Sequence, residues 1–165
     1  MGQDREEPRE RLTGSGRETL SRLSWLTAYA LGMAYVEAAV VAYLRLLAPG
    51  QAFDASQAAV AGALPLRVVY TEAGREAATL VMLVAVAFLA ARKRWWQRLG
   101  YLLWVFAVWD ILYYAWLRVL IGWPPSLMTM DVLFLIPFVW VAPVLFPIAV
   151  SGVMMVLALA ILKRA

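Results

Sequence analysis

The sequence predicts an all-α membrane protein: a four-helix transmembrane bundle whose final segment is broken by proline. Hydrophobic residues make up 64% of the 165 residues and charged residues only 16%, against about 25% charged in a soluble domain. Four apolar stretches are each close to or longer than the roughly 20 residues that cross a bilayer as a helix. Pro137, Pro143 and Pro147 interrupt the last stretch, and proline breaks or kinks a helix.

Residues 1–23 are expected to form a disordered cytoplasmic tail. They contain five Arg and five acidic residues together with Pro and Gly, and they show no apolar face. A cleaved signal peptide is the rival interpretation, but the tail is rich in acidic residues and the apolar stretch after it outruns a signal-peptide core. We therefore expect a single membrane domain over residues 24–165, beginning with a retained helix.

The expected spans cover about residues 24–48, 67–91, 98–121 and 143–162. The final apolar stretch, 131–162, would be about 48 Å long as one helix, which exceeds a bilayer core. We therefore expect a half-helix or interfacial segment over 131–141, before a span that begins at Pro143. Its eleven residues are too few to make a fifth span.

Small residues recur every four positions on the first span. Such a stripe lets a neighbouring helix approach closely. Close packing is therefore expected along Ala30, Ala34, Ala38 and Ala42.

Lys and Arg alternate in density between successive connections. The tail, the segment 92–98 (RKRWWQR) and Lys163-Arg164 are basic, whereas 49–65 and 122–130 contain no Lys or Arg. The positive-inside rule then places both termini in the cytoplasm, as in a multi-pass protein of the cell (inner) membrane. The lipid bilayer is the expected partner, and nucleic acid is not, because topology accounts for the net charge of +4. The Ala- and Arg-rich, Lys-poor composition suggests a bacterial source.

The chain contains no cysteine and no histidine. Disulfides, thiolate or imidazole catalysis, and the usual ligands of zinc, copper and iron–sulfur clusters are thereby excluded. No resident cofactor is expected. Oxygen ligands alone would favour a hard cation such as Mg²⁺, Ca²⁺ or Mn²⁺, but no spacing here matches a metal motif, so the identity of any metal stays unknown.

Ionisable and hydroxyl side chains recur three or four residues apart within the second and third spans, and Glu37 and Arg45 are aligned two turns apart on the first, so those of each span share one face of its helix. A charge that faces lipid costs about 2.5–3.5 kcal/mol. We therefore expect these faces to converge in an outward-facing pocket. Its expected ligand-binding residues are Glu37, Glu72, Arg75, Glu76, Asp110, Tyr114 and Arg118. Its expected rim residues are Arg45, Arg67, Tyr113 and Asp131.

Three functions fit such a pocket. Intramembrane ionisable residues usually mark ligand, ion or proton paths, which favours binding or transport of a small cationic or polar solute. The alternative is a structural ion-pair network in a homo-oligomer or in an accessory or assembly subunit of a larger membrane complex. A lipid-headgroup enzyme is the third, but the sequence has no Ser-His or Cys-His arrangement and no phosphate-binding glycine loop, so no catalytic residue is assigned.

Four spans with a glutamate in the first, Glu37, resemble the small multidrug transporters at the level of the fold. The chain departs from that pattern in its length, in its additional Arg and carboxylate residues, and in its proline-broken final segment. The resemblance therefore assigns no family.

Overall fold

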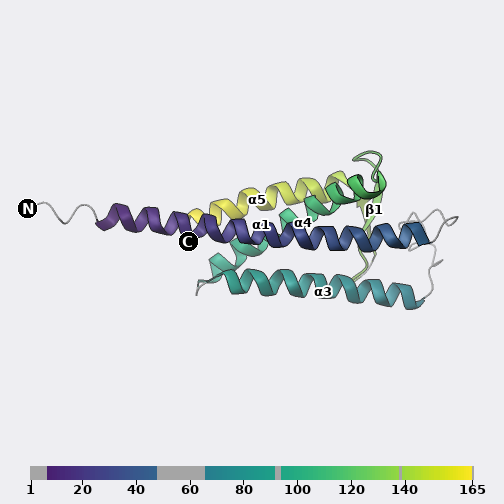
Figure 1. The fold of residues 1–165 in the computed structure, drawn as a ribbon, viewed down its shortest axis with the longest axis horizontal. Helices are drawn as coiled ribbons and strands as arrows, with labels where there is room; N and C mark the ends of the chain where they lie inside the picture. Colours follow the sequence, from purple (N-terminus) through teal and green to yellow (C-terminus); the bar gives the residue numbers. More distant parts are fainter. Residues whose placement is uncertain (1–6, 48–65, 92–93, 138, 165) are drawn as a thin grey trace, which may run out of the picture.

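The structure is a computed structural model that describes residues 7–47, 66–91, 94–137 and 139–164. Its elements are, along the chain, α1 (Glu7–Leu47), α3 (Leu66–Ala90), α4 (Trp95–Ile121), β1 (Met130–Phe134), β2 (Trp140–Pro143) and α5 (Leu145–Arg164). Successive helices run in opposite directions (Figure 1). We call the end of the bundle with Arg94, Lys163 and Arg164 the basic end, and the opposite end, with β1 and β2, the hairpin end.

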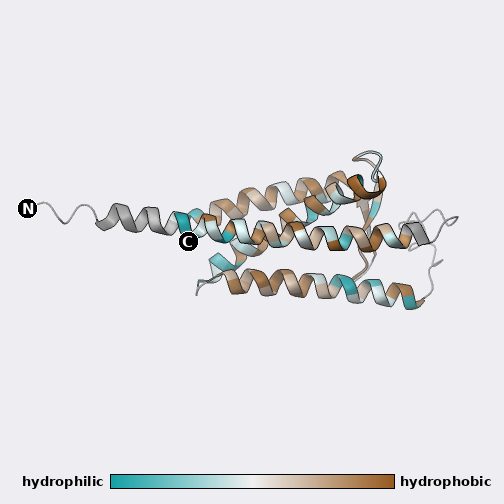
Figure 2. Ribbon diagram, in the orientation of Figure 1, coloured by the Kyte–Doolittle hydropathy of each residue, from teal (hydrophilic) through white to brown (hydrophobic). Residues whose placement is uncertain are grey.

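In the part of the chain that the structure describes, four helices are long and apolar enough to cross a membrane: Gly16–Leu44, Leu66–Ala90, Trp95–Ile121 and Leu145–Arg164. The outer surface is apolar, since side chains such as Leu89, Val119 and Val156 are largely exposed. On α3 the hydrophilic residues gather in the half nearest the hairpin end, and hydrophobic residues cover the rest (Figure 2). The chain is therefore a multi-pass helical bundle suited to lipid, as the sequence predicted.

Helix α4 is the central element of the bundle, because α1, α3 and α5 all pack against it. The small-residue stripe of α1 is buried: Ala30, Ala34 and Ala38 have no exposed surface, and α1 makes its most extensive contact with α4. Gly100 allows a similar approach of α5, since a Cβ atom at this position would lie 2.8 Å from Cγ of Leu162. Small residues thus let α1 and α5 pack closely against α4.

Two expectations from the sequence are wrong. The first is the half-helix over 131–141, because these residues lie in two strands and the connection between them. β1 and β2 pair antiparallel, with Asp131 opposite Ala142 and Val132 opposite Val141. The register then shifts at a bulge, after which Phe134 lies opposite Trp140. The β-branched and aromatic residues here favour strands, and Pro137, between the strands, cannot continue a helix. The final segment is therefore a β-hairpin followed by α5.

The amino-terminal tail gives the second correction. α1 begins at Glu7, so residues 7–23 continue the first span as one helix and are not disordered; residues 1–6 lie outside the described residues. Arg and Glu are good helix formers, and Glu18 pairs with Arg22 one turn later at 2.7 Å. This segment has no apolar face because it is highly charged, but its Arg and Glu residues still favour a helix.

Candidate functional site

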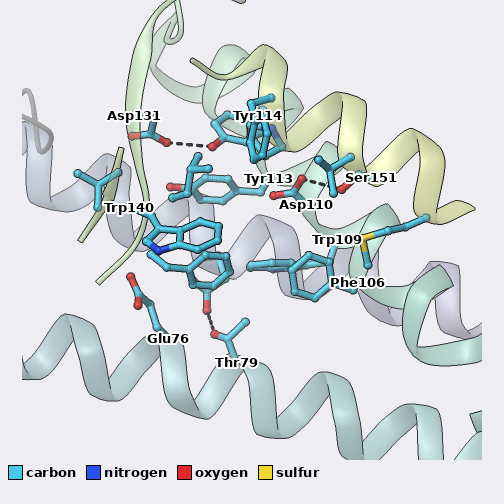
Figure 3. A pocket seen from close by; sticks show the side chains of 18 of the residues that line it. Glu76, Thr79, Phe106, Trp109, Asp110, Tyr113, Tyr114, Asp131, Trp140 and Ser151 are labelled. Carbon is cyan, nitrogen blue, oxygen red and sulfur yellow. Dashed lines mark hydrogen bonds between the residues drawn. The ribbon is translucent and has the colours of Figure 1, made fainter. Parts of the chain in front are cut away.

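A cavity of about 290 Å³ lies within the half of the bundle nearest the hairpin end. In Figure 3, α5 lies above it, α3 below it and the hairpin beside it, with α1 and α4 behind. Nearly all of its lining comes from α3, α4, the hairpin and α5, and α1 contributes Glu37. The cavity is thus lined by elements that are distant in the sequence.

A carboxylate from α1 and another from α3 share one guanidinium. Arg75 contacts Glu72, one turn earlier, with two nitrogens at 2.9 Å from Oε2, and it also forms an ion pair with Glu37 of α1. Thr79 donates a hydrogen bond to the same Glu37, which is 5% exposed. Because α1 and α3 share few other contacts, this cluster is the main link between them at this depth.

Glu76 attaches the hairpin to α3. Both of its carboxylate oxygens accept from the backbone N–H of Leu135, at 2.9 and 3.1 Å. Leu135 directly follows β1, so its amide is not used in the β1–β2 ladder. A charged acceptor for one backbone donor is a strong form of hydrogen bond, and it fixes the hairpin over the cavity.

Two further carboxylates join α4 to its neighbours. Asp110 accepts a hydrogen bond from the Ser151 hydroxyl of α5 at 2.8 Å, and Asp131 of β1 accepts one from the Tyr114 hydroxyl at 3.0 Å. Together with Glu37 and Glu76, every carboxylate that lines the cavity bonds to a residue outside its own element. Each one therefore contributes to the arrangement of the bundle.

Aromatic rings form much of the remaining wall. Along α4, Phe106 and Trp109 meet edge to face with ring centroids 5.4 Å apart, and Trp109 stacks on Tyr113 at 6.4 Å. Tyr113 meets Tyr114 edge to face at 5.1 Å, and Trp140 of β2 faces the same space (Figure 3). Ring faces carry partial negative charge and attract cations.

The charge of the cavity is unbalanced. Four carboxylates line it, those of Glu37, Glu76, Asp110 and Asp131, whereas Arg75 is the single basic residue among the described lining residues. That arginine is already engaged by Glu37 and by Glu72. A low-dielectric surrounding strengthens electrostatic interactions between such groups and their neighbours.

Within the described ranges, no three Asp, Glu, His or Cys side chains come together as a group that could hold a metal ion. The carboxylates are distributed around the cavity and tied to separate partners, so they do not form one coordination shell.

Most of the residues predicted for the pocket do meet at the cavity. Glu37, Arg75, Glu76, Asp110 and Tyr114 line it, and so do Tyr113 and Asp131, which were predicted for the rim. Glu72 contacts Arg75 but does not itself line the cavity. Arg67 is exposed near the start of α3, and the side chain of Arg45 lies outside the described residues.

Arg118 is the clear departure from the prediction. Its guanidinium turns away from the cavity and donates to the carbonyl oxygens of Gly122 at 2.5 Å and Pro124 at 3.0 Å. The last carbonyls of a helix lack partners within the helix, and a basic side chain in the last turn can bond to carbonyls there. Arg118 therefore stabilises the end of α4 and lines a separate hollow beside Pro124.

Sequence reasoning missed several lining residues. Trp140 could not be placed because the hairpin was not foreseen. Ser151 gave a signal, as an isolated hydroxyl within the apolar stretch 144–162, but nothing in the sequence paired it with Asp110. Phe106 and Trp109 resemble ordinary packing residues of membrane helices.

No protein family, curated protein or solved structure matches this chain. The function of the protein must therefore be inferred from the geometry and chemistry of the cavity.

Proposed function

We propose that this protein is a membrane protein that binds a small organic cation in the cavity beneath the hairpin. One observation carries the proposal: among the described residues, four carboxylates and several aromatic rings line the cavity, and the single arginine among them is already paired. Aromatic walls and carboxylates together are the surroundings that ammonium ligands prefer. The volume of about 290 Å³ is at the small end of ligand pockets and suits a small ligand.

Binding is favoured over passage through the bundle. Apolar side chains fill the half that lies between the cavity and the basic end, among them Leu26, Leu83, Ala87 and Val105. A charged solute would have to leave the carboxylates for this packed region, at a high cost in desolvation. We also propose that the basic end is cytoplasmic, which places the cavity towards the outer surface.

A structural role for the same charges is the second candidate, because each lining carboxylate bonds to a residue of another element. The two roles differ in what neutralisation does. Loss of a ligand site abolishes ligand-dependent stabilisation in a folded protein, whereas loss of a structural bond lowers stability without any ligand.

The test compares choline with dimethylbutanol, its uncharged carbon isostere, at constant ionic strength and in a neutral detergent. A ligand that binds only the folded state raises the unfolding temperature. We expect choline to raise it in the wild type and in Glu18→Gln, whose carboxylate pairs with Arg22 far from the cavity. Asp110→Asn should lose the effect while Ser151 keeps an acceptor. Equal effects of choline and dimethylbutanol, or an undiminished effect in Asp110→Asn, would contradict the proposal.

A further inference from the structure

The cavity changes in chemical character from one side to the other. Its carboxylates come from α1, α3, α4 and β1. The described lining residues of α5 carry no charge; they are Phe146, Pro147, Val150, Ser151 and Met154. A ligand that filled the cavity would therefore meet carboxylates on one side and the largely apolar face of α5 on the other.

Among the described elements, no helix closes the side of the cavity between α3 and α5. α3 and α5 line it from opposite sides, and each packs on α4, while the described parts of α3 and α5 share no extensive contact with each other. On α5, Phe146 and Val150 line the cavity and are also 50% and 41% exposed. Because α3 and α5 are both long and apolar enough to span a membrane, this opening would face hydrocarbon in a bilayer.

From these two observations we infer that the ligand is a cationic amphiphile, an ammonium headgroup carrying an alkyl chain, which enters sideways from the bilayer between α3 and α5. This inference rests on the proposed function, since it places the ammonium group among the same carboxylates and rings. The alkyl chain lies against the apolar residues of α5 and leaves through the opening beside Phe146 and Val150. The small volume then needs to hold only the headgroup and the first part of the chain.

The test uses an octyltrimethylammonium analogue with a photoreactive diazirine at the end of its chain, added to the protein in neutral detergent. Mass spectrometry locates the labelled residues. We expect labelling on the segment 146–154 of α5, suppressed by excess unlabelled octyltrimethylammonium and weakened about tenfold or more in Asp110→Asn, as expected on losing a charged contact. Labelling spread over lipid-exposed positions such as Leu89 and Val156, without suppression, would overturn the inference.

Two tryptophan substitutions on α5 provide a matched pair. Val150 lines the opening, whereas Val153 is 61% exposed on the same helix and does not line the cavity. Val150→Trp should abolish the specific labelling, and Val153→Trp should retain it. Equal labelling in the two variants would exclude entry at this opening.

The outcomes separate this inference from the proposed function. If choline stabilises the wild type but the photoreactive probe gives no suppressible label on α5, the cation site stands and lateral entry fails. If neither choline nor octyltrimethylammonium stabilises the protein, and no label is suppressible, both fail together.

Discussion

Arg75 is the residue on which the charged cluster depends. It pairs with Glu72 on its own helix and with Glu37 across the interface to α1. The side chain of Glu37 is buried, so its ionised form needs a nearby cation. The cluster is consequently both a helix contact and one wall of the cavity.

Removal of the guanidinium should destabilise the fold. We expect Arg75→Met to lower the free energy of unfolding by about 3 kcal/mol, because breaking a buried ion pair leaves its partner uncompensated. Chemical unfolding in mixed micelles measures this change. Arg67→Met, one of the exposed positions on the same helix, serves as the control and should remain close to the wild type.

A second substitution should recover part of the loss. Adding Glu37→Gln to Arg75→Met removes the more deeply buried of the two carboxylates that lose their partner, while leaving an acceptor for Thr79. The two effects should therefore be strongly non-additive, as for residues in one network. Additive effects, or an Arg75→Met variant as stable as Arg67→Met, would show that the ion pair does not stabilise the fold.

The β-hairpin is the element that completes the cavity, and Glu76 connects it to α3. Without this acceptor, the Leu135 amide would have to find a new partner or remain unpaired, at a cost of about 1–3 kcal/mol if it stays buried. The hairpin is thus held in place partly by one carboxylate.

Hydrogen exchange of the hairpin tests this attachment. In Glu76→Ala we expect amides in 130–143 to exchange about tenfold faster, since each 1.4 kcal/mol corresponds to a factor of ten in an opening equilibrium. Glu72→Ala removes a carboxylate one turn away that does not contact the hairpin, and its exchange there should match the wild type. Similar acceleration in both variants would show a general loosening of α3.

The contact between α4 and α5 depends on Gly100. A methyl group there would meet Leu162 Cγ at 2.8 Å and Cδ2 at 2.9 Å, and overpacking of this kind costs about 1–3 kcal/mol. We expect Gly100→Ala to lower the unfolding temperature, whereas Gly152→Ala should not, because a Cβ there meets nothing within 4 Å. A Gly100→Ala variant as stable as Gly152→Ala would mean that Leu162 moves aside without a cost in stability.

The helices were predictable from the sequence, and the hairpin was not. Hydrophobic length alone defines a membrane span, so the four spans could be located before the structure. A short apolar run such as 130–143 has no periodicity that separates strand from helix. The charged faces could be grouped by helical spacing, but the direction of the long Arg118 side chain could not, because carbonyls beyond the end of α4 compete for it.

At the scale of the whole molecule, charge is distributed unequally between the two ends. Arg94, Lys163 and Arg164 lie at the basic end, and the cavity with its carboxylates lies towards the hairpin end. Basic residues are retained on the cytoplasmic side of a membrane. The proposed orientation in the membrane, with the basic end in the cytoplasm, follows from this asymmetry.

The orientation can be measured directly because the chain has no native cysteine. Met128, in the connection between α4 and β1, is 63% exposed. We expect Met128→Cys to react with a membrane-impermeant maleimide on intact spheroplasts, and Lys163→Cys to react only after permeabilisation. The opposite pattern would invert the topology and move the cavity to the cytoplasmic side.

Equilibrium binding of radiolabelled choline to the purified protein, in neutral detergent, tests the proposed cation site most directly. We expect saturable binding with one site per chain, not displaced by dimethylbutanol, retained in Glu18→Gln and weakened about tenfold or more in Asp110→Asn. Absence of saturable binding to a stably folded wild type would contradict the proposal, and the carboxylates would then be a structural network that holds the bundle together.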